Sequence, residues 1–128
     1  MLPWAVDTPF FEHAANYSGH RTRMAAMDDP KKVIDTIVRA TVYPREEIPV
    51  GWKARGAYWS HRVAPDITER LSANIAHAEQ FEKAPSAPAT SGALHQPMQS
   101  GTAVTGGMRA RMEREDAARK AAMPATSD

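Results

Sequence analysis

The sequence of 128 residues contains no cysteine, which excludes disulfide bonds and thiolate metal ligands. It also has no apolar run near the roughly 20 residues that a membrane-spanning helix requires. The 16 Lys and Arg residues almost balance the 15 Asp and Glu residues, so no overall field attracts nucleic acid or an anionic membrane. Because residues 1–7 lack the pattern of a signal peptide, we expect a cytoplasmic protein.

Aromatic residues are absent from positions 84–128, where only two residues are Leu, Ile or Val. The first half of this stretch also lacks Asp, Glu, Lys and Arg and is rich in Ala, Ser, Thr, Pro and Gly. This composition predicts a low-complexity, disordered tail over 84–128. A transient helix is expected at 109–123, with nothing to anchor it. The folding part is then 1–83, which is small for a stable core.

The clearest predicted element is a helix over residues 30–43. Asp28 or Asp29 can accept hydrogen bonds from the N–H groups of its first turn, and a proline fits its first position, where no N–H is needed. One apolar stripe follows the helical period, formed by Val33, Ile34, Ile37, Val38 and Thr41. Two further helices are expected at 52–61 and 66–83, and the second is amphipathic.

A short strand is predicted at 46–50, where Ile48 and Val50 share one face. Pro49 cannot donate a hydrogen bond to a neighbouring strand, so an edge position is favoured. The chain offers no second strand of similar quality, and an unpaired strand leaves backbone groups without partners. The predicted fold class is therefore mainly α with one short orphan β-strand. The apolar stripe and this strand edge can support self-association.

Residue types that often carry chemistry are present but scattered. The five histidines form no i, i+4 pair and no cluster with carboxylates, so we expect no metal site. Four basic residues, Arg21, Arg23, Lys31 and Lys32, are interpreted as solvated surface charge. The basic residues of 109–123 alternate with three acidic ones that cancel most of their field. Nucleic-acid binding is therefore the least favoured function.

One stretch near the start has a more specific pattern, Pro-Trp-Ala-Val-Asp-Thr-Pro-Phe at 3–10. It resembles the segment after the sixth strand of short-chain dehydrogenases/reductases, which usually reads Pro-Gly, one residue, Val or Ile, one residue, Thr, often followed by Pro and Phe. The matching residues are Pro3, Val6, Thr8, Pro9 and Phe10. Trp4 stands where the family has glycine. An Asp-Pro helix and a Pro-Arg…Val-Gly segment at 43–51 follow in the family's order, and the resemblance covers 3–80.

The resemblance implies the carboxyl-terminal part of an α/β, Rossmann-like fold with a doubly wound parallel sheet. The backbone of Val6 and the hydroxyl of Thr8 are then expected to face the nicotinamide of NAD or NADP. A substrate loop over 1–27 is expected to cover the cleft with Phe10, Phe11, His13, Asn16 and Tyr17. The family activity is NAD(P)-dependent oxidoreduction of small alcohol or carbonyl substrates.

The chain does not contain the family's glycine-rich cofactor turn or its catalytic Tyr-x-x-x-Lys pair, since no tyrosine is followed four residues later by lysine. The resemblance therefore assigns it no catalytic residue. We expect the isolated chain neither to bind NAD(P) nor to turn over substrate. The alternative function is a small helical protein-interaction module that uses 65–83 and the tail.

Overall fold

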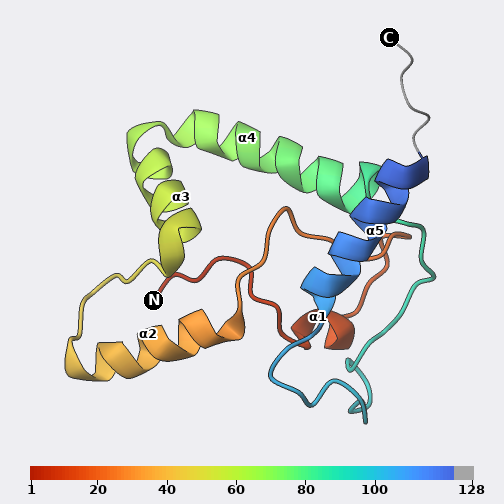
Figure 1. Cartoon of the computed structure of the whole chain (residues 1–128), viewed down its shortest axis with the longest axis horizontal. Coiled ribbons are helices and arrows are strands. Elements are labelled where there is room, and N and C mark those ends of the chain that lie inside the picture. Colours follow the sequence, from red (N-terminus) through yellow and green to blue (C-terminus); the bar gives the residue numbers. More distant parts are fainter. Residues whose placement is uncertain (123–128) are drawn as a thin grey trace.

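The computed structural model describes residues 1–122, which are mainly helical. In chain order the helices are α1 (Phe10–His13), α2 (Pro30–Val42), α3 (Gly51–Val63), α4 (Pro65–His77), the π-helical segment η1 (Ala78–Glu82) and α5 (Met108–Ala122). Helices α3 and α4 meet at a corner, and α4 reaches across the molecule towards α5 (Figure 1). Pairing between extended segments within residues 1–122 is limited to four isolated bridges, so the mainly α fold class is confirmed.

Helix α2 begins at the predicted residue for the predicted reason. The Asp29 side chain accepts a hydrogen bond from the N–H of Lys31 at 2.8 Å, and Pro30 occupies the first helical position. The face that α2 turns to the rest of the chain shares only Val33 with the predicted stripe. That face consists of three half-buried side chains, Val33, Thr36 and Ala40, whereas most of the stripe is exposed, namely Ile34, Ile37 and Val38.

The two later helices are confirmed with small changes at their ends. Helix α3 begins one residue early, at Gly51, whose φ of 76° lies in the left-handed region that favours glycine. The predicted helix over 66–83 divides into α4 and η1, and the wider turn of η1 contains the buried carboxylate of Glu79. Helix α1 was not predicted, because its single turn is too short to show a period.

The predicted strand at 46–50 is reduced to one parallel bridge between Leu2 and Pro49. The N–H of Leu2 donates to the carbonyl of Ile48 at 2.9 Å, and the N–H of Val50 donates to the carbonyl of Leu2 at 3.0 Å. Pro49 is tolerated because its nitrogen points away from Leu2. The prediction that the chain supplies no partner is therefore wrong, since the partner comes from a stretch that the sequence suggested was only loop.

The segment after η1 returns along the first 27 residues instead of leaving the molecule (Figure 1). Antiparallel bridges join Asn16 to Thr90 and His20 to Ser86. The predicted disordered tail is therefore not separate from 1–83 in the structure, and its helix is anchored. Backbone groups, glycines and methionines make these contacts. The prediction of disorder considered only aromatic residues and Leu, Ile and Val, so it missed them. Residues 123–128, which include the last position of the helix predicted at 109–123, lie outside the described part.

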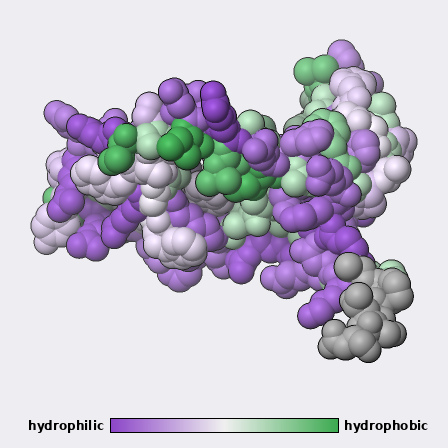
Figure 2. Space-filling view, turned by 90° about the horizontal axis from the view of Figure 1, so that it is seen from above, coloured by the Kyte–Doolittle hydropathy of each residue, from purple (hydrophilic) through white to green (hydrophobic). Residues whose placement is uncertain are grey.

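The apolar core is small for a chain of this length. Its buried members are Met27, Val50, Ala54, Ala84, Met108 and Met112. Three of the methionines form one cluster, on which Phe11 and Met24 pack from the side. Many larger apolar side chains are exposed, and Figure 2 shows such surface on the side where α4 lies. Within residues 1–122, no helix combines the length and apolar character needed to cross a membrane.

Candidate functional site

A cavity of about 520 Å³ lies between the first 27 residues, the returning segment and the start of α5. Three of the predicted site residues, Thr8, Phe11 and Asn16, line it. The returning segment contributes Pro88, Thr90 and Gly106 to the opposite side, and the remaining lining includes Arg21, Arg111 and Arg114. The lining of the cavity thus mixes apolar and polar side chains, with Glu12 beside the three arginines, and it is the place where sequence-predicted site residues come together.

The main chain around Val6 and Thr8 is engaged within the molecule. The N–H of Thr8 donates to the carbonyl of Val6 at 2.8 Å, and Val6 forms a parallel bridge with Asp28. Gly106 lies directly against the carbonyl of Thr8, since a Cβ at this glycine would clash with the carbonyl oxygen. The returning segment therefore covers the backbone that was predicted to face nicotinamide.

The two predicted phenylalanines separate. Their rings meet edge to face with centroids 5.4 Å apart, but Phe10 is 66 % exposed and Phe11 packs against the methionine cluster. Phe11 therefore serves the core as well as the cavity wall, and Phe10 lies outside the lining of the cavity.

The remaining loop residues are placed differently from one another. Asn16 exchanges two backbone hydrogen bonds with Thr90, at 2.8 and 2.9 Å, and its amide nitrogen donates to the carbonyl of His20. The Nε2 atom of His13 lies 2.9 Å from the carbonyl of Ser100. Tyr17 is exposed and does not line the cavity. Asn16 and His13 thus hold the returning segment in place.

Asp7 is a residue that sequence reasoning missed, and it fixes the start of α5. Its side chain is buried and accepts hydrogen bonds from the N–H of Met108 at 2.8 Å and from that of Arg109 at 3.4 Å. A carboxylate satisfies the unpaired N–H groups at a helix N-terminus and complements the helix dipole. Nothing in the local sequence indicates this contact, because the partners are 101 positions apart.

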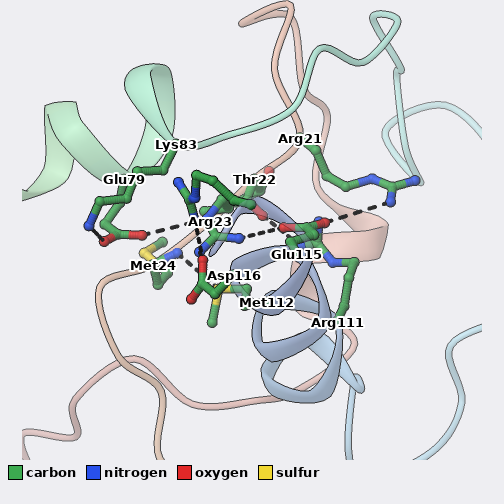
Figure 3. Close-up of polar contacts among 11 residues, drawn as sticks. Arg21, Thr22, Arg23, Met24, Glu79, Lys83, Arg111, Met112, Glu115 and Asp116 are labelled. Carbon is green, nitrogen blue, oxygen red and sulfur yellow. Dashed lines mark hydrogen bonds and ion pairs between the residues drawn. The ribbon is translucent and has the colours of Figure 1, made fainter. Parts of the chain in front are cut away.

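Arg23 occupies the centre of a network that joins the loop, η1 and α5 (Figure 3). Its side chain is only 2 % exposed, and its two terminal nitrogens donate to Glu115 at 2.5 Å and Asp116 at 2.6 Å. Its Nε lies 3.5 Å from Glu79 without a hydrogen bond to any group of residues 1–122. Burial alone would lower the pKa of Arg23, but the bonds to Glu115 and Asp116 outweigh it and raise that pKa. The interpretation of Arg23 as solvated charge is wrong.

Asp28 forms a second buried charge centre, beneath α2 and α3. Its carboxylate receives hydrogen bonds from Lys53 at 2.8 Å and from Lys32 at 3.1 Å. Burial would raise the pKa of Asp28, but the two ammonium groups together hold this pKa below its usual value. The i, i+4 spacing to Lys32 is visible in the sequence, whereas the contact with Lys53 depends on the fold.

The arginines at the cavity are partly neutralised by α5 itself. Arg111 donates to the carbonyl of Thr22 at 2.6 Å and to Glu115 at 3.1 Å. Partial burial lowers the pKa of Arg111, although Glu115 opposes the shift. Arg114 forms no ion pair with another residue of 1–122. The positive charge at the cavity is therefore partly compensated by Glu115 of α5 and by Glu12 of the lining.

No cluster of three or more His, Cys, Asp or Glu residues able to hold a metal ion occurs within 1–122. Comparisons of the chain with family models, with curated proteins and with solved structures found no match.

Proposed function

We propose that the chain is a carboxyl-terminal segment of a short-chain dehydrogenase/reductase-like fold. In this proposal it supplies the nicotinamide-facing and substrate-facing loop of an NAD(P)-dependent oxidoreductase that acts on small alcohols or carbonyls. The observation that carries the proposal is the parallel pairing of Leu2 with Pro49, whose intervening chain contains α2. Two parallel strands need a crossover connection, and a helix is the usual one in α/β folds.

The outward side of α2 also supports this proposal. Ile34, Ile37 and Val38 are exposed although they form a continuous apolar stripe. In α/β folds, crossover helices bury such stripes against the faces of a parallel sheet. Residues 1–122 contain two parallel bridges but no sheet that could cover this stripe. A larger sheet would bury it and would extend the pairing at Leu2.

The proposal assigns the chain a supporting role in the reaction. The Thr8 hydroxyl would contact the carboxamide of NAD or NADP, while Phe11 and Asn16 would line the substrate side of the same cavity. Proton transfer and phosphate binding would belong to the catalytic pair and glycine-rich turn of the complete family fold. The isolated chain is expected to be inactive, because Gly106 covers the Thr8 backbone.

Reconstitution tests this function. The chain is mixed with the amino-terminal two-thirds of a short-chain dehydrogenase, which carries the glycine-rich turn and the Tyr-x-x-x-Lys pair. We expect NADH- or NADPH-dependent carbonyl reduction only in the mixture. Thr8→Val, which removes one hydroxyl, should lower this rate about tenfold, as expected for one lost hydrogen bond. Thr102→Val removes an exposed hydroxyl of the returning segment and should leave the rate unchanged.

Calorimetric titration of the isolated chain with both cofactors completes the test. Micromolar binding of NAD or NADP by the chain alone would contradict the proposal, as would equal rates with Thr8→Val and the unchanged chain. A protein-interaction module is the second candidate function. It is favoured by α4, whose residues 69–77 are all exposed to solvent.

A further inference from the structure

Helix α4 is supported only at its ends. It packs against α3 at its first turn and continues into η1 at its last, and every residue from Glu69 to His77 is exposed. A helix of this length is marginally stable in water without a packed face. The middle of α4 would therefore be stabilised by a partner that covers one of its faces.

One side of α4 carries an apolar row. Val63, at the end of α3, is followed at intervals of four residues by Ile67, Leu71 and Ile75. All four are exposed, Ile67 by 70 % and Leu71 by 57 %. Residues four apart lie one above the other on a helix, so Ile67, Leu71 and Ile75 form a continuous row along α4, whereas Val63 precedes the bend at Ala64. Figure 2 looks onto the molecule from this side and shows apolar side chains at its surface.

Two opposite charges border this row on the same flank. At about 100° per residue, Asp66 and Arg70 lie next to each other beside Ile67 and Leu71. Both are exposed, and neither forms an ion pair with another residue of 1–122. Glu69 lies on the opposite side of the helix from the row. The flank is therefore self-complementary when it is reversed in direction.

We propose that α4 is a dimerisation surface whose occupant is α4 of a second copy of this chain, packed antiparallel. In this register Ile67 of each copy lies against Leu71 of the other. Asp66 of each copy then faces Arg70 of the other, so the two-fold axis repeats the ion pair. A parallel arrangement would bring this flank against the opposite flank of the second copy and would not form the pair. The proposal does not depend on the oxidoreductase function.

The chemistry of α4 favours a second copy over a membrane surface. Helices that lie on membranes carry Lys and Arg on the polar face, whereas this one carries Asp66 and Glu69 with Arg70. The contact is short, because 13 residues span about 20 Å. It falls at the small, transient end of protein interfaces, so the dimer should dissociate on dilution.

Sedimentation velocity across a dilution series from about 500 to 1 μM measures this association. We expect dimer at the upper end and monomer at the lower end. Leu71→Lys should shift the midpoint to at least tenfold higher concentration. Glu69→Lys changes a charge on the opposite side of the same helix and should leave the midpoint unchanged. Far-ultraviolet circular dichroism confirms that both variants keep the helical content.

Charge reversal identifies the register. Arg70→Glu and Asp66→Lys should each weaken the dimer, because each places like charges opposite one another. An equimolar mixture of the two variants should form a heterodimer at least as stable as the unchanged dimer. In the mixture the new lysine faces the new glutamate, and Arg70 of one copy faces Asp66 of the other. Fraying of α4 in either variant would not produce this rescue.

Four results would overturn the proposal. The first is that the chain is monomeric at every concentration, and the second is that the mixture sediments no faster than the two variants alone. The third is that Ile37→Asp abolishes association while Leu71→Lys does not. This third result would assign the interface to α2. Binding to vesicles of anionic lipid without self-association would count equally against it.

Discussion

Arg23 holds a loop in place by charge where apolar contacts are few. It draws Glu115 and Asp116 of α5 together with Glu79 of η1, so one side chain joins three segments. Breaking a buried ion pair by removing one partner leaves the other charges uncompensated, which costs more than the intact pair contributes. The residue therefore controls whether α5 stays docked.

Arg23→Met tests this role, since methionine keeps most of the volume but not the charge. We expect a loss of about 3 kcal/mol in the docking of α5, at the lower end for a buried pair because Asp116 is half-exposed. Tryptic cleavage within α5 tracks the undocked population and should rise about 100-fold. Glu113→Gln, at an exposed position of α5, removes a charge without removing a tryptic site; it is the control and should change the rate little. Equal rates for the two variants would show that α5 is held by its methionines alone.

The Asp28 centre predicts a dependence on acid. Its pKa in the folded chain lies below the usual 3.8, so the ionised form is favoured by folding. The stabilisation it provides is complete above about pH 3.8 and is lost as the pH falls through the lowered pKa. Amide exchange reports this loss through the protection factor of the Asp7 N–H, which donates to the Asp28 carbonyl.

In the unchanged chain the protection factor should stay constant from pH 5 to about pH 4 and should fall as the pH drops below 3.8. In Asp28→Asn it should be low already at pH 5, and the pH step should shrink. Asp35→Asn removes a carboxylate whose partner, Lys31, is exposed, and it serves as the control. A step of equal size in both variants would assign the acid sensitivity to another carboxylate.

Among the elements, those with strong local signals were predictable from the sequence. Asp29, a proline at the first helical position and a stop before Pro44 located α2 within one residue at its end. The extended segment at 46–50 was less predictable from the sequence. Its single bridge is to Leu2, which lies nearly fifty positions earlier in the chain. Of the candidate site, Thr8, Phe11 and Asn16 do share one cavity, but their covering by the returning segment has no local signature.

The returning segment is fitted to the loop through glycine. At Gly106 a Cβ would meet the Thr8 carbonyl, so Gly106→Ala should push the segment away from the loop. The Gly106 N–H now donates to the Asp7 carbonyl at 3.1 Å, and its hydrogen-exchange protection should fall about tenfold or more. Gly56→Ala has open space around its Cβ and should instead stabilise α3 by about 1 kcal/mol. Unchanged protection in Gly106→Ala would show that the segment is not held there.

In the apolar stripe of α2, unlike at Gly106, we expect a substitution to leave the fold unchanged. Ile37 is about half exposed, so Ile37→Asp should leave the far-ultraviolet helical signal nearly unchanged and raise solubility. Val33→Asp, one turn earlier on the half-buried face, should reduce the helical signal. Static light scattering with circular dichroism compares the two. A large loss of helix in Ile37→Asp would show that the stripe is already covered.

At the scale of the whole molecule, little apolar surface is buried. The buried apolar residues are few and mostly small or flexible, while side chains as large as Trp52 and Trp59 are exposed. Fully burying one large apolar side chain contributes about 1.5–3 kcal/mol. Because these large apolar side chains stay exposed, the chain alone does not gain the free energy that their burial would contribute.

We therefore expect no sharp thermal transition in differential scanning calorimetry, although circular dichroism should show a helical signal. Folded domains have about 5–15 kcal/mol in total, and the uncovered residues of α2 and α4 withhold a comparable amount. If α4 associates as proposed, the transition should sharpen as concentration rises. A cooperative melt of a dilute monomer would contradict this expectation and favour an independent helical module.

The contact between Asp7 and Met108 has a consequence for the order of events during synthesis. Its two partners are 101 positions apart, and Met24 and Met112 are 88 apart. At about 5–20 residues per second, Asp7 leaves the ribosome about 5–20 s before the helix that it caps. During that time the cluster around Met27 has no covering, so the nascent chain displays apolar surface to chaperones. The docking of α5 on the loop is thus a late step in the folding of this chain.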